Sequence, residues 1–143
     1  MPDNRPAFHV IFMNFATELA RRSTCRRLQV GCVIASEDYR RVYAVGYNGN
    51  ASGDANDCDR HGEAAVGNCG CLHAEENAVI NCTVERFFRK VVFCTHLPCV
   101  MCAKRLINLG GVLRIYYGEA YRSTDSIPIL EKAGIPVLRV VPP

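Results

Sequence analysis

Apolar residues along this chain recur with two different periods, and their alternation predicts a layered α/β protein. Near the N-terminus, five large apolar residues follow one another at helical spacing: Phe8, Ile11, Phe12, Phe15 and Leu19. This spacing predicts a helix over residues 7–22 that turns the five side chains toward the core.

Two β-branched runs come next, at residues 30–35 and 41–46, and a polar turn around Asp38 separates them. They predict a β-hairpin. Because the stretch from Val30 to Ile34 is continuously apolar, we expect the first strand to be buried on both faces.

Beyond residue 72, helical and extended segments alternate along the chain. The pattern predicts helices over residues 72–81, 99–109 and 126–133, and strands over residues 90–95, 112–117 and 136–140. Helices on both faces of one mixed, five-stranded sheet suit this order of elements. We therefore predict an α/β fold, a three-layer α-β-α sandwich formed by a single domain over residues 1–143.

Length and composition are those of an ordinary globular protein of 143 residues, with 49% hydrophobic and 22% charged residues. No apolar stretch is long enough to span a membrane, and the first six residues contain no apolar signal-peptide core. We expect a cytoplasmic protein without a membrane partner. A net charge of +3 is too small to argue for nucleic acid as a partner.

Nine cysteines are many for this length, and their number is odd. In a secreted chain they would suggest disulfides. Without a signal peptide, metal binding together with buried free thiols explains them better, and we expect no structural disulfide.

Two short stretches carry the chemistry: His73-Ala74-Glu75 and Pro98-Cys99-Val100-Met101-Cys102. One imidazole and two thiols are ligands that zinc prefers, and three protein ligands leave a fourth position for water. Zinc lowers the pKa of such a water toward neutrality, and Glu75 can move its proton. The two stretches together predict a catalytic zinc site with an acid/base beside it.

The spacing within each stretch predicts how the ligands meet. Cys99 and Cys102 are three residues apart, so they share one face of a helix that Pro98 suits as a start. His73 and Glu75 are only two apart and would diverge within a regular helix. They converge if His73 lies at the very start of a helix, so we expect two helix N-termini to meet at one metal.

His-x-Glu followed by Pro-Cys-x-x-Cys resembles the zinc-dependent cytidine/deoxycytidylate deaminase superfamily. Four longer runs look most like its deoxycytidylate (dCMP) deaminase branch: residues 30–34, 46–49, 71–78 and 97–104. The resemblance extends over residues 8–138, and the paired motif is highly specific. It implies that the sandwich is cytidine deaminase-like.

The resemblance also implies a reaction, the hydrolytic deamination of dCMP to dUMP and ammonia, which supplies dUMP for dTMP synthesis. Zinc on His73, Cys99 and Cys102 would activate water, and Glu75 would carry its proton to ring N3 and then to the leaving amine. Enzymes of this branch are often homo-oligomers, commonly hexamers. Many respond to dCTP and dTTP, in some cases with Mg²⁺ accompanying the nucleotide effector.

Four residues are candidates for substrate contacts. Asn48 lies in an Asn-Gly turn, and the resemblance implies that its amide hydrogen-bonds the sugar or base. Ala74, within the zinc motif, is a second candidate. Arg26, beside Arg27, belongs either to a solvated basic loop or to an anion site for the substrate phosphate. Tyr121 follows the predicted strand over residues 112–117, at an end where α/β proteins place ligands.

A long loop over residues 51–72, rich in Gly, Asp and Asn, contains three cysteines and His61. Some phage and bacterial dCMP deaminases that this chain resembles hold a second, structural zinc. The resemblance assigns that site to four residues here, with His61 as an alternative to one of them: Cys25, Cys58, Cys69 and Cys71. The competing interpretation is a loop with scattered free thiols.

Three other functions compete with the deamination of dCMP. The first is deamination of another cytosine nucleoside or nucleotide, including 5-modified ones, or of tRNA adenosine. The second is an inactive zinc module that binds nucleotides, which the intact Glu75 argues against. The third is a structural zinc interaction module, which the large apolar core and the one-His, two-Cys ligand set make a poor fit.

Overall fold

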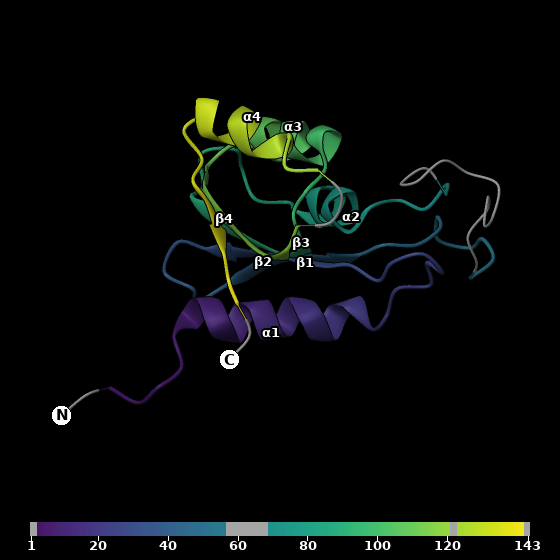
Figure 1. The fold of residues 1–143 in the computed structure, drawn as a ribbon, viewed down its shortest axis with the longest axis horizontal. Coiled ribbons are helices and arrows are strands. Elements are labelled where there is room, and N and C mark those ends of the chain that lie inside the picture. The colour runs from purple at the N-terminus through teal and green to yellow at the C-terminus, as the bar shows by residue number, and fades with distance from the viewer. Residues whose placement is uncertain (1–2, 57–68, 121–122, 142–143) are drawn as a thin grey trace.

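The strands of the central sheet lie in the order β2-β1-β3-β4-β5 (Figure 1). The computed structural model describes residues 3–56, 69–120 and 123–141. The helices are α1 (Phe8–Ala20), α2 (Ala74–Asn81), α3 (Val100–Leu109) and α4 (Ser126–Lys132). The strands are β1 (Gly31–Ser36), β2 (Val42–Tyr47), β3 (Lys90–His96), β4 (Val112–Glu119) and β5 (Val137–Arg139).

The sheet is mixed, as predicted. Strand β1 runs antiparallel to both β2 and β3, whereas β3, β4 and β5 run parallel to one another. Helix α1 covers one face, and α2, α3 and α4 cover the other (Figure 1). Every residue of β1 is buried, which confirms the prediction from its continuous apolar run. The three-layer α-β-α fold is therefore confirmed.

Helix α1 forms where predicted, and two of the five predicted core residues do face the core: Phe12 is buried and Leu19 packs against the same cluster. Its buried residues are Phe12, Met13, Ala16 and Ala20. Three residues of the predicted stripe are instead exposed, Phe8 at 54%, Ile11 at 44% and Phe15 at 38%. The prediction was wrong for these three residues because small residues let the helix lie closer to the sheet: a Cβ on Gly31 would lie only 2.0 Å from the Ala16 carbonyl oxygen.

Helix α2 lies directly against strand β2, and a glycine makes this possible. A Cβ on Gly46 would lie 2.3 Å from the carbonyl oxygen of Ala74 and 2.5 Å from the backbone nitrogen of Ala78. One turn apart on α2, the side-chain amides of Asn77 and Asn81 donate to carbonyl oxygens of β2, each across 2.9 Å. The position of α2 is thus fixed relative to the sheet.

A buried lysine lies where strand β3 begins. Lys90 begins β3 and is fully buried. The three N–H groups of its ammonium are shared among four backbone carbonyl oxygens at 2.7–3.3 Å from Nζ, those of Glu85, Arg86, Phe88 and Gly110. Burial lowers the pKa of this ammonium. The four acceptors offset part of that cost, and they join the loop before β3 to the turn before β4.

Among the described helices, none is long and apolar enough to cross a membrane.

Candidate metal centre and active site

A cavity of about 580 Å³ lies at the end of the sheet where β3 ends and β1 begins. Its wall includes the N-terminal turns of α2 and α3 and the segment before β1. Both predicted zinc-motif stretches line it, with His73, Glu75 and Cys99 among the wall residues. Two helix N-termini therefore meet at one site, as the motif spacing predicted.

Three possible zinc ligands, one nitrogen of His73 and the sulfurs of Cys99 and Cys102, come together there. His73 is the N-cap of α2, and Cys99 is the N-cap of α3, where its sulfur accepts from the Cys102 backbone N–H. His73 Nδ1 lies 3.6 Å from Cys99 Sγ and 3.3 Å from Cys102 Sγ. With Zn–S near 2.3 Å and Zn–N near 2.0 Å, a tetrahedral ion separates such donors by about 3.6 Å. The geometry and the donor chemistry fit zinc.

The same cluster holds a thiolate beside a protonated imidazole. A hydrogen bond from the Cys102 thiol holds the pKa of Cys99 at about 3. That thiolate is the main reason why the pKa of His73 rises to about 9, and it also raises the pKa of Cys102. A divalent cation displaces the protons held on such groups because thiolate and neutral imidazole are its ligand forms.

Glu75 lies in the first turn of α2 and is 5% exposed. Burial raises the pKa of this carboxyl, because the charged form loses hydration. A carboxyl whose pKa is moved toward neutrality is suited to accept a proton and then return it. It stands two residues from His73, in the same cavity.

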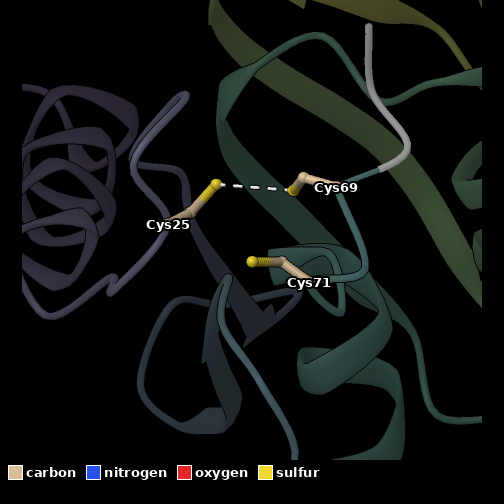
Figure 2. Close-up of side chains that lie close together, drawn as sticks. All are labelled: Cys25, Cys69 and Cys71. Atoms are coloured by element: carbon tan, nitrogen blue, oxygen red, sulfur yellow. Dashed lines mark hydrogen bonds between the residues drawn. The ribbon is translucent and has the colours of Figure 1, made fainter. Parts of the chain in front are cut away.

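A second group of thiols, those of Cys25, Cys69 and Cys71, lies in the same cavity wall. Figure 2 shows Cys25, from the segment between α1 and β1, facing Cys69 and Cys71, from the segment before α2. The sulfurs of Cys25 and Cys69 are 3.8 Å apart, and all three sulfurs lie within 4.8 Å of one another. Sulfurs on one tetrahedral zinc would be about 3.8 Å apart. The predicted ligand Cys58 and the alternative His61 lie outside the described residues.

Two of the four predicted substrate contacts line the cavity. Asn48 and Ala74 line the cavity. The Asn48 amide also anchors the chain before β1, since its Oδ1 accepts from the Val30 N–H across 2.8 Å and its Nδ2 donates to the Leu28 carbonyl across 2.6 Å. Of the two arginines, Arg26 is exposed and absent from the described cavity wall, and Arg27 lines it. Tyr121 lies outside the described residues.

Two further wall residues were missed as site residues by sequence reasoning. Glu76 Oε1 accepts from the His73 backbone N–H across 3.0 Å, and Glu76 Oε2 lies 3.4 Å from a terminal nitrogen of Arg105. The side chains of Glu76 and Arg105 together hold the start of α2, and Arg105 reaches it from α3. A Glu three residues after an N-cap is a readable signal. The position of Arg105 has no such local signal, because it depends on how α2 packs beside α3.

Comparison with known proteins agrees with this geometry. The family model for the cytidine and deoxycytidylate deaminase zinc-binding region matches residues 7–119. The deoxycytidylate deaminase of Schizosaccharomyces pombe is 32% identical over 97% of this chain and 46% of its own length. That of Mycobacterium phage D29 is 34% identical over 80% of this chain and 96% of its own.

A solved structure is similar throughout. The dCMP deaminase of cyanophage S-TIM5 in complex with dCMP and dUMP matches with a TM-score of 0.83 and 31% identity, over 96% of this chain and 100% of the phage chain. By contrast, the chain spans about half the length of two yeast deoxycytidylate deaminases, 46% of that from Schizosaccharomyces pombe and 46% of that from Saccharomyces cerevisiae. The matched family model and the assembled His/Cys/Cys cluster lead to one conclusion: the chain belongs to the cytidine and deoxycytidylate deaminase zinc-binding family.

Proposed function

We propose that this protein is a zinc-dependent hydrolase that converts dCMP to dUMP and ammonia. The observation that carries the proposal is the cluster of His73, Cys99 and Cys102. Two members of this cluster, His73 and Cys99, line the same cavity as the buried carboxyl of Glu75. Names of relatives support the choice of substrate, since several are deoxycytidylate deaminases and one related structure holds dCMP and dUMP.

The protein's own residues have distinct parts in this proposal. His73, Cys99 and Cys102 would hold a zinc ion, which when bound supplies the Lewis acidity that activates water for attack on C4 of cytosine. Glu75 accepts one proton from the attacking water and donates it to N3, then accepts the proton of the hydroxyl formed at C4 and donates it to the leaving amine. The Ala74 N–H, one of the helix N-terminal donors that lack an intrahelical acceptor, would donate to the ring carbonyl.

The sugar and phosphate would extend along the wall that precedes β1. Asn48 keeps one amide proton and one oxygen lone pair beyond its two backbone bonds, and these can serve the sugar. Arg27 is the better candidate for the phosphate, because it lines the cavity and Arg26 does not. Its rigid fork of donors suits a phosphate.

The proposal is tested by incubating the full chain with dCMP, CMP, deoxycytidine and dCTP separately. Loss of cytosine absorbance is followed, and zinc is measured on the same sample. We expect fast loss with dCMP and slow loss with the others. Equal rates with dCMP and deoxycytidine would refute a phosphate site at Arg27. No turnover by zinc-loaded protein would refute the proposed function and direct the search to tRNA or a binding role.

We further propose that Cys25, Cys69 and Cys71 hold a second zinc, with Cys58 as the fourth ligand. Three sulfurs within 4.8 Å of one another, with one pair 3.8 Å apart, support this, and an all-thiolate site suits a structural zinc without an open position. The expected content is about two zinc per chain. A content of one, unchanged when Cys71 is replaced, would refute the second site.

We also propose that the protein is a homo-oligomer, with a hexamer as the expected size. The apolar face of α1 formed by Phe8, Ile11 and Phe15 supports association, because exposed apolar residues clustered on one face favour contact with a partner. Light scattering tests the size.

Activation by dCTP and inhibition by dTTP, with Mg²⁺ accompanying the nucleotide, are proposed from the family resemblance and are tested by adding each to the dCMP assay.

A further inference from the structure

Cys25, Cys69 and Cys71, which we call the thiol cluster, lie close to the catalytic zinc ligands both in the cavity wall and along the chain. Cys71 comes two residues before His73, and His73 is the N-cap of α2. One short segment, residues 69–73, therefore carries two of the three thiols together with the imidazole of the catalytic site. The third thiol, that of Cys25, comes from a different part of the chain.

The segment that carries Cys25 is fixed at both ends. At its start, the Ser23 backbone N–H donates to the Ala20 carbonyl oxygen of α1 across 3.0 Å. The Cys25 backbone N–H in turn donates to the Ser23 hydroxyl across 3.2 Å. At its end, directly before β1, the Asn48 side chain accepts from the Val30 N–H across 2.8 Å. Cys25 therefore presents its thiol from a support that is attached to α1 and to the sheet.

The segment that leads into His73 is attached to the sheet at Leu72. The Leu72 N–H donates to the Gly49 carbonyl oxygen across 2.8 Å, and the Gly49 N–H donates back across 3.1 Å. Before Leu72, residues 69–71 belong to no helix or strand, and Gly70 has a φ of +93°, which glycine adopts without steric cost. A common ion on the thiol cluster would add one attachment on each side of Gly70 (Figure 2).

Of the three catalytic zinc ligands, His73 is the one whose position depends on this segment. Cys99 and Cys102 share the first turn of α3, and a hydrogen bond from the Cys102 backbone N–H to the Cys99 sulfur joins them. A displacement of His73 would change the distances of its Nδ1 from both sulfurs, which are now 3.6 and 3.3 Å. A site whose ligands are held in place beforehand loses less conformational freedom when it binds.

We propose that the thiol cluster positions His73, so that loading the thiol cluster with zinc raises the affinity of the catalytic site for its own zinc. The inference rests on the second zinc proposed above. Because coupling between two binding sites is reciprocal, loading the catalytic site raises the affinity of the thiol cluster by the same factor. Groups that orient a metal ligand typically change the metal affinity by about 10- to 100-fold, and we expect a coupling of this size.

The test measures the zinc affinity of each site in the full chain by competition with a chelator. Cys25→Ser leaves residues 69–73 unchanged, so it can reach His73 only through the thiol cluster. It should release one zinc per chain and lower the zinc affinity of the catalytic site by about 10- to 100-fold. Cys25→His keeps a ligand that zinc accepts and should restore part of that affinity. Cys102→Ala removes a catalytic ligand and should lower the zinc affinity of the thiol cluster by the same factor.

Two matched controls separate coupling from a general loss of stability. Lys90→Met destabilises the fold where β3 begins, and Cys82→Ser removes a thiol that belongs to neither cluster of zinc ligands. Both should keep the wild-type zinc affinity of the catalytic site.

The inference is overturned if Cys25→Ser releases one zinc and keeps the catalytic-site affinity within twofold of wild type, or if Lys90→Met lowers that affinity equally. If Cys25→Ser does not fold, Cys102→Ala decides, because an unchanged affinity of the thiol cluster also overturns the inference. Two zinc ions retained by Cys25→Ser would instead refute the second zinc site. None of these measurements needs turnover, so the proposed deamination of dCMP stands or falls separately.

Discussion

Gly46→Ala tests whether the close contact between β2 and α2 positions the catalytic groups. The added Cβ would lie 2.3 Å from the Ala74 carbonyl oxygen and 2.5 Å from the Ala78 backbone nitrogen, and ordinary contact begins at 3.4 Å. Both obstacles are backbone atoms, so no side-chain rotation relieves them. Helix α2 must move outward by about 1 Å, which would shift Glu75 relative to Cys99. A misplacement of that size costs about 10²-fold in rate, and the overpacking costs about 1–3 kcal/mol of stability.

The assay measures kcat for dCMP per zinc-loaded chain, together with urea unfolding. Gly31→Ala is the matched control, because its Cβ would meet backbone atoms of α1 on the other face of the sheet. We expect both variants to lose stability and only Gly46→Ala to lose about 10²-fold in kcat. The positioning argument is refuted if Gly46→Ala is as destabilised as Gly31→Ala and yet turns over dCMP within twofold of wild type.

Three further predictions follow from the site and the fold. Glu75→Gln should bind zinc normally and lose about 10²–10⁴-fold in kcat, and near wild-type turnover would contradict the assigned proton transfer. Lys90→Met should lower the free energy of unfolding by about 3 kcal/mol, since four buried carbonyl oxygens lose their donor, while the kcat of the folded protein is unchanged. Cys71→Ser should lower the zinc content measured by atomic absorption from about two to about one per chain. Cys82 belongs to neither cluster of zinc ligands, so Cys82→Ser should leave the zinc content at about two.

The sequence by itself predicted the elements and the first donor cluster, because both depend on local spacing. Cys99 and Cys102 share a helix face at any orientation of that helix, and the two-residue gap between His73 and Glu75 makes sense only at a helix start. The observed N-cap positions of His73 and Cys99 agree with that reasoning. Burial of β1 was equally readable, since only a strand covered on both faces is apolar at successive positions.

Only the tertiary structure decided which faces those elements turn inward and which polar side chains reach the cavity. Helix α1 has apolar residues around much of its circumference, and contact between Ala16 and Gly31 selected the face that is buried. Arg26 and Arg27 are adjacent and chemically identical, yet one is exposed and the other lines the site. The physical reason is common to both cases. Burial and proximity are set by what lies opposite a residue, and that partner comes from a distant part of the chain.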